Sequence, residues 1–124
     1  TNMSESNIAI LTDVVQVTCV VDHGKGEEVV KAARGAGAGG ALIHSARGVG
    51  IRERMGLLAI AVEAEKDIVE MLVGSDQAEM VAHAIFSSVD LGRPGGGMVY
   101  LTPLESVATF LPKEIHDRFR EQSK

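Results

Sequence analysis

The stretch Val14–Val21 (VVQVTCVV) decides the fold, because its β-branched residues alternate as in a strand that has one wholly apolar face. The apolar face consists of Val15, Val17, Cys19 and Val21, and the opposite, mixed face consists of Val14, Gln16, Thr18 and Val20. The mixed face is too apolar for a sheet surface left open to water. We therefore expect it to pack on another subunit of a homo-oligomer.

The order strand, helix, glycine-rich stop, strand occurs twice along the chain. The predicted elements that follow the first strand are a helix at 26–37, a strand at 41–44, an extended run at 57–62, a strand at 67–73, a helix after Ser75-Asp76 and a strand at 98–102. Asp76 and Glu79 have the spacing of a capping box at the start of the second helix. The doubled unit predicts an α+β, ferredoxin-like βαββαβ sandwich, a four-stranded antiparallel sheet with two helices on one face.

Length and composition fit one domain. With 124 residues and 45% hydrophobic content, the chain can form one ordinary core, predicted over 13–111. We expect a flexible N-terminal segment at 1–12 and a C-terminal tail at 112–124 that forms a short helix or a frayed end. Cys19 is the only cysteine and lies in an apolar run, which predicts a buried thiol and excludes an internal disulfide.

Charge and hydropathy exclude several classes of protein. A net charge of −5 and 3% aromatic residues disfavour nucleic-acid binding. The sequence has neither a run of ~18 apolar residues nor a signal peptide, which predicts no membrane insertion and a cytoplasmic location.

Two glycine-rich segments beside predicted strands each carry an arginine, 47–50 (RGVG) and 91–97 (LGRPGGG). Glycines allow backbone N–H groups to converge, and a fixed positive charge next to them favours phosphate or carboxylate. The predicted nucleotide- or anion-binding residues are Arg47, Gly48, Gly50, Gly92, Arg93, Gly95, Gly96 and Gly97, with Arg93 as the main charge contact. Within the segment 47–56, Arg52, Glu53 and Arg54 are predicted to form a partner or effector loop that ligand binding orders.

Catalytic and metal-binding patterns are not found in the sequence. The four histidines show no i,i+4 pair and no neighbouring cysteine cluster, so no metal site is predicted. No serine lies in a nucleophile elbow, and no carboxylate pair divides into acid and base. We therefore predict no catalytic residue and no enzymatic activity.

Four motifs in order resemble the P-II nitrogen regulatory protein family, and within it the divergent members with a shortened T-loop. They are 31–37 (KAARGAG), 47–50 (RGVG), 64–69 (AEKDIV) and 92–97 (GRPGGG), the last followed by a strand similar to the family's final one. The resemblance implies a homotrimer that binds ADP, ATP or AMP as effector in clefts between subunits, without a cofactor. It also implies signalling through a mobile loop to a regulated transporter or enzyme.

The chain departs from the family pattern at positions that contact phosphate or 2-oxoglutarate in typical members. Met98 follows Gly97 where those members have lysine, and Thr109 and Leu111 occupy the positions of two arginines. The residues after Gly50 are Ile51-Arg52 in place of Arg-Gln. These departures argue against binding of magnesium-ATP together with 2-oxoglutarate.

Two alternatives remain open from the sequence. One is a binding module of the same fold for bicarbonate, another carboxylate or a metal ion, which the missing basic residues favour. The other is a small enzyme on a ferredoxin-like scaffold that uses the glycine loop as an oxyanion cradle.

Overall fold

The computed structural model of the chain describes residues 7–48, 64–93 and 95–110. Its elements are β1 (Ile8–Leu11), β2 (Val14–Asp22), α1 (Gly26–Gly35), β3 (Leu42–Gly48), β4 (Ala64–Gly74), α3 (Ala78–Ser88), β5 (Met98–Leu104) and β6 (Val107–Phe110). They divide into a larger unit over 15–103 and a smaller unit that contains both ends of the chain. Within the described residues, no helix has the length and apolar character needed to cross a bilayer.

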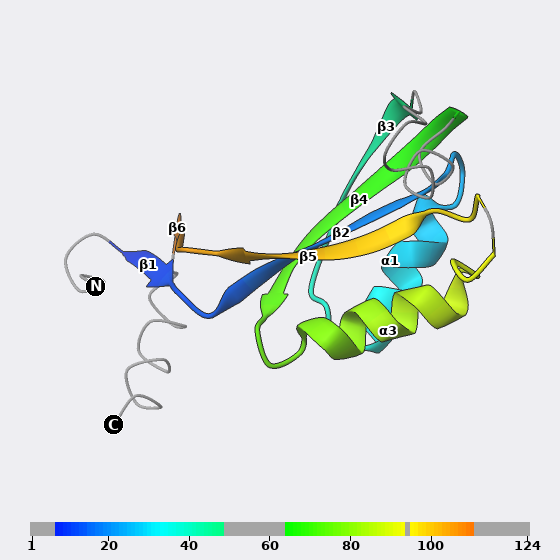
Figure 1. Cartoon of the computed structure of the whole chain (residues 1–124). Helices are drawn as coiled ribbons and strands as arrows, with labels where there is room; N and C mark the ends of the chain where they lie inside the picture. The colour runs from blue at the N-terminus through cyan, green and yellow to red at the C-terminus, as the bar shows by residue number, and fades with distance from the viewer. Residues whose placement is uncertain (1–6, 49–63, 94, 111–124) are drawn as a thin grey trace, which may run out of the picture. The chain divides into compact units, whose positions relative to one another are not determined.

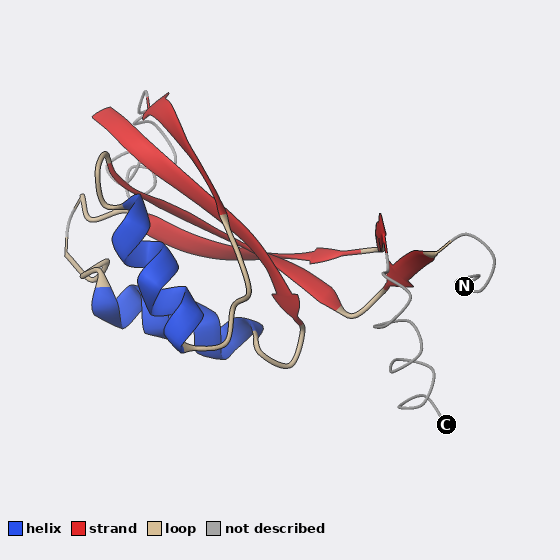
Figure 2. Ribbon diagram, turned by 180° about the vertical axis from the view of Figure 1, so that it is seen from behind, coloured by secondary structure: helices blue, strands red, loops and turns tan. Residues whose placement is uncertain are grey.

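The larger unit contains a four-stranded sheet in the order β3-β4-β2-β5. Strands β3 and β4 pair antiparallel, from Leu42 opposite Glu70 to Gly48 opposite Ala64. Strand β4 therefore lies between β2 and β3, the two strands that α1 connects, as in a split βαβ unit. Both helices cover the same face of the sheet (Figures 1 and 2). The predicted ferredoxin-like α+β fold is confirmed.

The core lies between the sheet and the two helices. The predicted apolar face of the first strand supplies Val15, Val17, Cys19 and Val21, and the neighbouring β4 supplies Val69, Met71 and Val73. Val29 on α1 and Val81 and Ile85 on α3 complete the centre and are fully buried. Burial raises the pKa of the Cys19 thiol to about 12, so this cysteine is an inert core residue.

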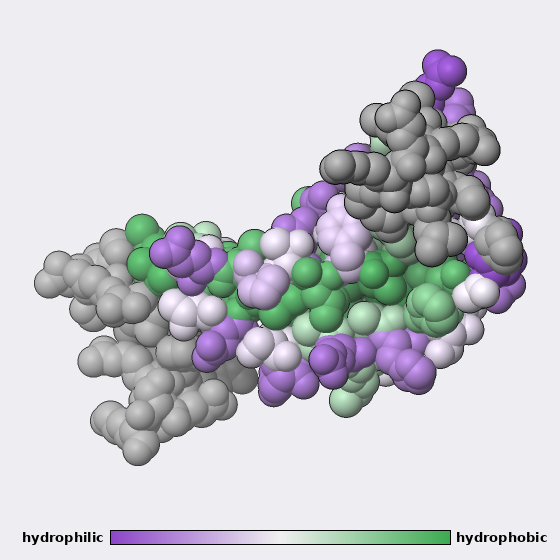
Figure 3. Space-filling view, viewed as in Figure 1, coloured by the Kyte–Doolittle hydropathy of each residue, from purple (hydrophilic) through white to green (hydrophobic). Residues whose placement is uncertain are grey.

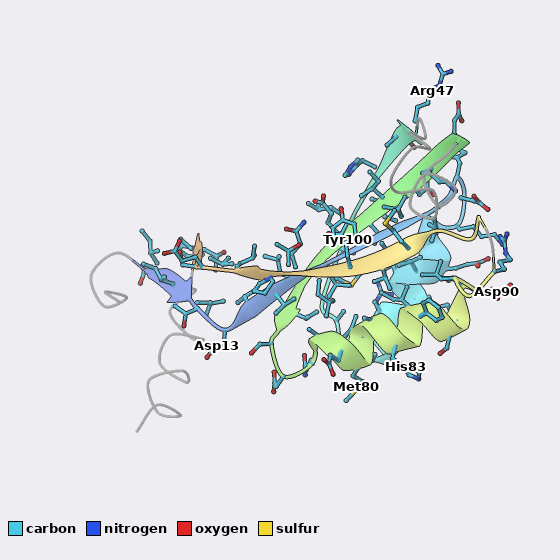
Figure 4. The ribbon with its side chains drawn as sticks, in the orientation of Figure 1. Asp13, Arg47, Met80, His83, Asp90 and Tyr100 are labelled. Atoms are coloured by element: carbon cyan, nitrogen blue, oxygen red, sulfur yellow. The ribbon has the colours of Figure 1, made fainter. Side chains whose placement is uncertain are left out.

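The face without helices is only partly covered. Thr18 and Val20 on the central strand β2 are buried, yet they lie outside the core cluster. On the neighbouring strands, Leu42, Leu72 and Tyr100 are 71%, 48% and 48% exposed. Tyr100 lies on the side of β5 opposite to the helices (Figure 4). A band of hydrophobic residues runs along β5, next to a mixed surface of hydrophilic and hydrophobic residues over α3 (Figure 3).

Two local predictions are wrong. The strands β3 and β4 extend their ladder beyond the predicted ranges, so Arg47 and Gly48 lie in a strand rather than in a turn, opposite Glu65 and Ala64. The predicted capping box of Asp76 does not form, because the helix begins one residue later than that box requires. The Gln77 N–H donates to the Gly74 carbonyl at 2.9 Å in a tight turn, and Gln77 becomes the N-cap. The predicted extended run 57–62 lies outside the described residues.

The smaller unit contains a two-stranded antiparallel sheet of β1 and β6, with Ile8 opposite Phe110 and Leu11 opposite Val107. Strand β1 was not predicted, and it lies within the segment 1–12 that we expected to be flexible. The predicted C-terminal tail, 112–124, lies outside the described residues.

Candidate functional site

Three segments that are distant in sequence meet at one end of the four-stranded sheet. The His23 N–H, just after β2, donates to the Glu65 carbonyl at the start of β4 at 3.3 Å. The loop before β5 reaches the same place, because the Arg93 Nη2 donates to the Asp22 Oδ2 at 3.3 Å. The β2 end, the β4 start and the glycine loop therefore share one surface.

The glycine loop packs directly on the backbone of β2. Gly97 has a φ of +117°, and a Cβ added there would overlap the Val20 carbonyl oxygen. A Cβ on Gly96 would lie 2.8 Å from the Asp90 carbonyl oxygen, and the Gly96 N–H donates to the Arg93 carbonyl at 3.1 Å. Gly95 has a φ of +75° with open space around it. Close packing requires glycine at 96 and 97, and backbone conformation favours it at 95.

Asp22 lies at the centre of a charged group that we call the Asp22 cluster, consisting of Asp22, Lys66, Asp90 and Arg93. The Lys66 Nζ donates to the Asp22 Oδ1 at 2.8 Å, and the Lys66 side chain is only 3% exposed. The Arg93 Nε lies 3.6 Å from the Asp90 Oδ2. The hydrogen bond from Lys66 is the main reason why the pKa of Asp22 is lowered, and Arg93 adds to the shift.

Asp67 fixes the turn that leads from β2 into α1. Its Oδ2 accepts hydrogen bonds from the N–H groups of Gly24 at 2.9 Å and Gly26 at 3.1 Å, and its Oδ1 lies 3.0 Å from the His23 Nδ1. The N-cap residue Lys25 makes no side-chain cap within the described chain, so this carboxylate caps the helix from a different strand. Burial acts to raise the pKa of Asp67, but these hydrogen bonds outweigh it and lower the pKa below its ordinary value.

The structure does not gather all the predicted binding residues within one chain. Arg47 and Gly48 lie at the same end of the sheet as the glycine loop, but on β3, with β4 and β2 between them and β5. Three strand spacings correspond to about 14 Å. Figure 4 shows Arg47 at the tip of β3, separate from Asp90 beside the glycine loop. Gly50, Arg52, Glu53 and Arg54 lie outside the described residues.

Asp22, Lys66 and Asp67 are not among the predicted site residues, although they make most of the described polar contacts at this end. The one available signal was the Lys66-Asp67 pair at the entry of an apolar strand, where charged side chains need partners. Their partners, at Asp22 and at Gly24 and Gly26, are more than 40 residues away in sequence.

A concave surface lies between α1 and the start of β3. This cleft has a volume of about 730 Å³, within the usual range for small-molecule sites, and its lining includes Val30 and Ile43. Its charged lining residues are Glu27, Glu28, Lys31 and Arg34. Because two acidic and two basic side chains balance, the cleft offers no net positive charge to an anion.

Over the residues with described coordinates, no group of three or more histidine, cysteine, aspartate or glutamate side chains could hold a metal ion.

Comparison with known proteins gives a family model and a solved structure. The model described as "Nitrogen regulatory protein P-II" matches residues 14–114. The crystal structure of Arabidopsis thaliana PII bound to citrate is similar with a TM-score of 0.60 and 22% sequence identity, over 76% of this chain and 79% of that one. No curated protein sequence gave a significant match.

Proposed function

Because this chain belongs to the P-II nitrogen regulatory protein family, we propose that it binds an adenine nucleotide at the glycine loop and signals to a protein partner. P-II proteins are regulatory signal transducers and not enzymes. The observation that carries the proposal is the exposed Arg93 on a loop that packs against β2 at Gly97. An exposed guanidinium at such a loop is suited to phosphate oxygens.

We further propose that the binding cleft forms between subunits of a homotrimer in the cytoplasm. Within one chain, Arg47 on β3 lies three strand spacings from β5, the strand that the glycine loop precedes, so the two predicted binding segments do not lie side by side. The exposed apolar side chains on the face without helices favour burial against another copy. The β3–β4 connection that starts at residue 49 would carry the signal to a regulated transporter or enzyme.

Assembly has a direct test. The wild-type protein is expected to have about three times the 13.1 kDa chain mass in solution. The Leu72→Glu variant places a charge on the face without helices and is expected to shift the protein toward the monomer. Met80→Glu is the matched control, since Met80 is also exposed but lies on the outer side of α3 (Figure 4). Light scattering coupled to size exclusion measures both, and a monomeric wild type would contradict the trimer.

Ligand binding is tested by calorimetry with AMP, ADP, ATP and cyclic AMP. We expect at least one of them to bind, and Arg93→Ala to weaken that binding by about 10- to 100-fold, because a charge-assisted hydrogen bond is lost. Arg34→Ala is the matched control, since Arg34 lines the cleft beside α1. A loss on Arg34→Ala alone would move the site to that cleft, and no response to any nucleotide would remove the assignment.

A carboxylate effector is the second candidate. The similar Arabidopsis protein was crystallised with citrate, a small polycarboxylate. Carboxylates and phosphates use the same arginine and backbone N–H donors. Citrate and bicarbonate therefore belong in the same titration series, and binding of one of them without any nucleotide would favour this candidate.

A further inference from the structure

The cations at the glycine loop already have anionic partners within the chain. Asp22 places one carboxylate oxygen 2.8 Å from the Lys66 Nζ and the other 3.3 Å from the Arg93 Nη2. Asp90 lies 3.6 Å from the Nε of the same arginine. A ligand phosphate or carboxylate that used Arg93 would approach the position that the Asp22 carboxylate occupies.

The two partners of Asp22 are held very differently. Lys66 is 3% exposed and has its shortest polar contact with Asp22, so this pair is fixed. Arg93 and Asp22 are 48% and 43% exposed, and the longer contact between them is a weak, solvated ion pair. Arg93 can therefore leave Asp22 at small cost, whereas Asp22 itself stays in place beside the bound ligand.

We infer that Asp22 is an internal anion that competes with the ligand for Arg93 and cancels the gain in affinity that a ligand of high charge would otherwise have. The inference rests on the proposed function in taking the glycine loop as the ligand contact. The Asp22 cluster contains two carboxylates and two cations, so it has no net formal charge. Each added ligand charge is then repelled by Asp22 and Asp90 nearly as much as it is attracted by Lys66 and Arg93. Such a site gives a triphosphate little advantage in affinity over a ligand with one phosphate or carboxylate group.

The test uses phosphate, pyrophosphate and tripolyphosphate as probes, titrated at constant ionic strength into the full-length protein. Asp22→Asn removes the charge but keeps an oxygen that accepts from the Lys66 Nζ. We expect its affinity for tripolyphosphate to rise on the order of tenfold, with a smaller rise for pyrophosphate and the smallest for phosphate. Asp76→Asn changes the net charge equally at the opposite end of β4, about 26 Å away at the rise of a strand, and is expected to change none of them.

A second variant keeps the test valid if Asp22→Asn does not fold. Asp90 is 77% exposed and makes one long contact with Arg93, so Asp90→Asn is expected to fold and to show a weaker gain with the same dependence on ligand charge. Adding Arg93→Gln to either variant is expected to reduce the gain, because the arginine that the carboxylate releases is then missing.

The outcomes separate this inference from the proposed function. An affinity gain that does not grow with ligand charge, or that is undiminished without Arg93, would overturn the inference. If nucleotides bind the wild type and neither Asp22→Asn nor Asp90→Asn raises the affinity for tripolyphosphate, the inference is wrong and the function stands. If no nucleotide binds while tripolyphosphate affinity rises as described, the nucleotide assignment is wrong and the role of Asp22 stands.

Discussion

Replacing Gly97 with alanine is expected to lower the free energy of unfolding by about 3 kcal/mol or more. The backbone there has a φ of +117°, which costs an L-residue with a Cβ about 1–2 kcal/mol. The new methyl group would also overlap the Val20 carbonyl oxygen of the central strand β2, so the loop or β5 would have to move. Urea unfolding followed by far-UV circular dichroism measures the loss.

Two other glycines provide graded controls for this prediction. Gly95 also has a positive φ of +75° but no atom within 4 Å of an added Cβ, so Gly95→Ala is expected to cost only about 1 kcal/mol. Gly35 ends α1 with open space around it, and Gly35→Ala is expected to be neutral or slightly stabilising. Equal losses for Gly95 and Gly97 would show that conformation alone matters and that the loop does not pack on β2.

The second large effect is expected from Asp67→Ala, with a loss of about 2–4 kcal/mol. This buried carboxylate accepts the N–H groups of Gly24 and Gly26 and contacts His23, and its removal leaves the first N–H of α1 without a partner. A loss of that size corresponds to a fall in Tm of roughly 10–20 °C for a domain of about 100 residues. Asp90→Asn is the control, since Asp90 is an exposed carboxylate in a weak ion pair and asparagine tolerates the positive φ of 55° at this position.

The same residue predicts a pH dependence whose sign follows from its lowered pKa. In the unfolded chain Asp67 takes up a proton near its ordinary pKa of 3.8, and in the folded chain only at a lower pH. The stability that Asp67 contributes is therefore fully present above pH ~4 and is lost as the pH falls through the folded pKa. Asp67→Asn is expected to flatten the fall in stability below about pH 4. An unchanged acid profile in that variant would contradict the assignment.

The fold could be predicted from the chain because its signals are local. The alternation of apolar and mixed positions along Val14–Val21 and the repeated strand–helix order both depend on neighbouring residues. These two patterns correctly predicted the order of the layers and the buried face of the first core strand. Element ends were predicted less well, because cross-strand pairing decided them. Arg47 and Gly48 continue β3 since Glu65 and Ala64 lie opposite, and no residue near Arg47 carries that information.

The sequence by itself determined the ferredoxin-like architecture, the buried Cys19 and the presence of an arginine on a glycine-rich loop. Only the tertiary structure decided what that arginine and its neighbours contact. Asp22 meets Lys66 and Arg93, and Asp67 caps a helix on another segment, across separations of 41 to 71 residues. The physical reason is that hydropathy fixes which side chains leave water. Which charged side chains become partners depends on which strand ends the folded sheet brings together.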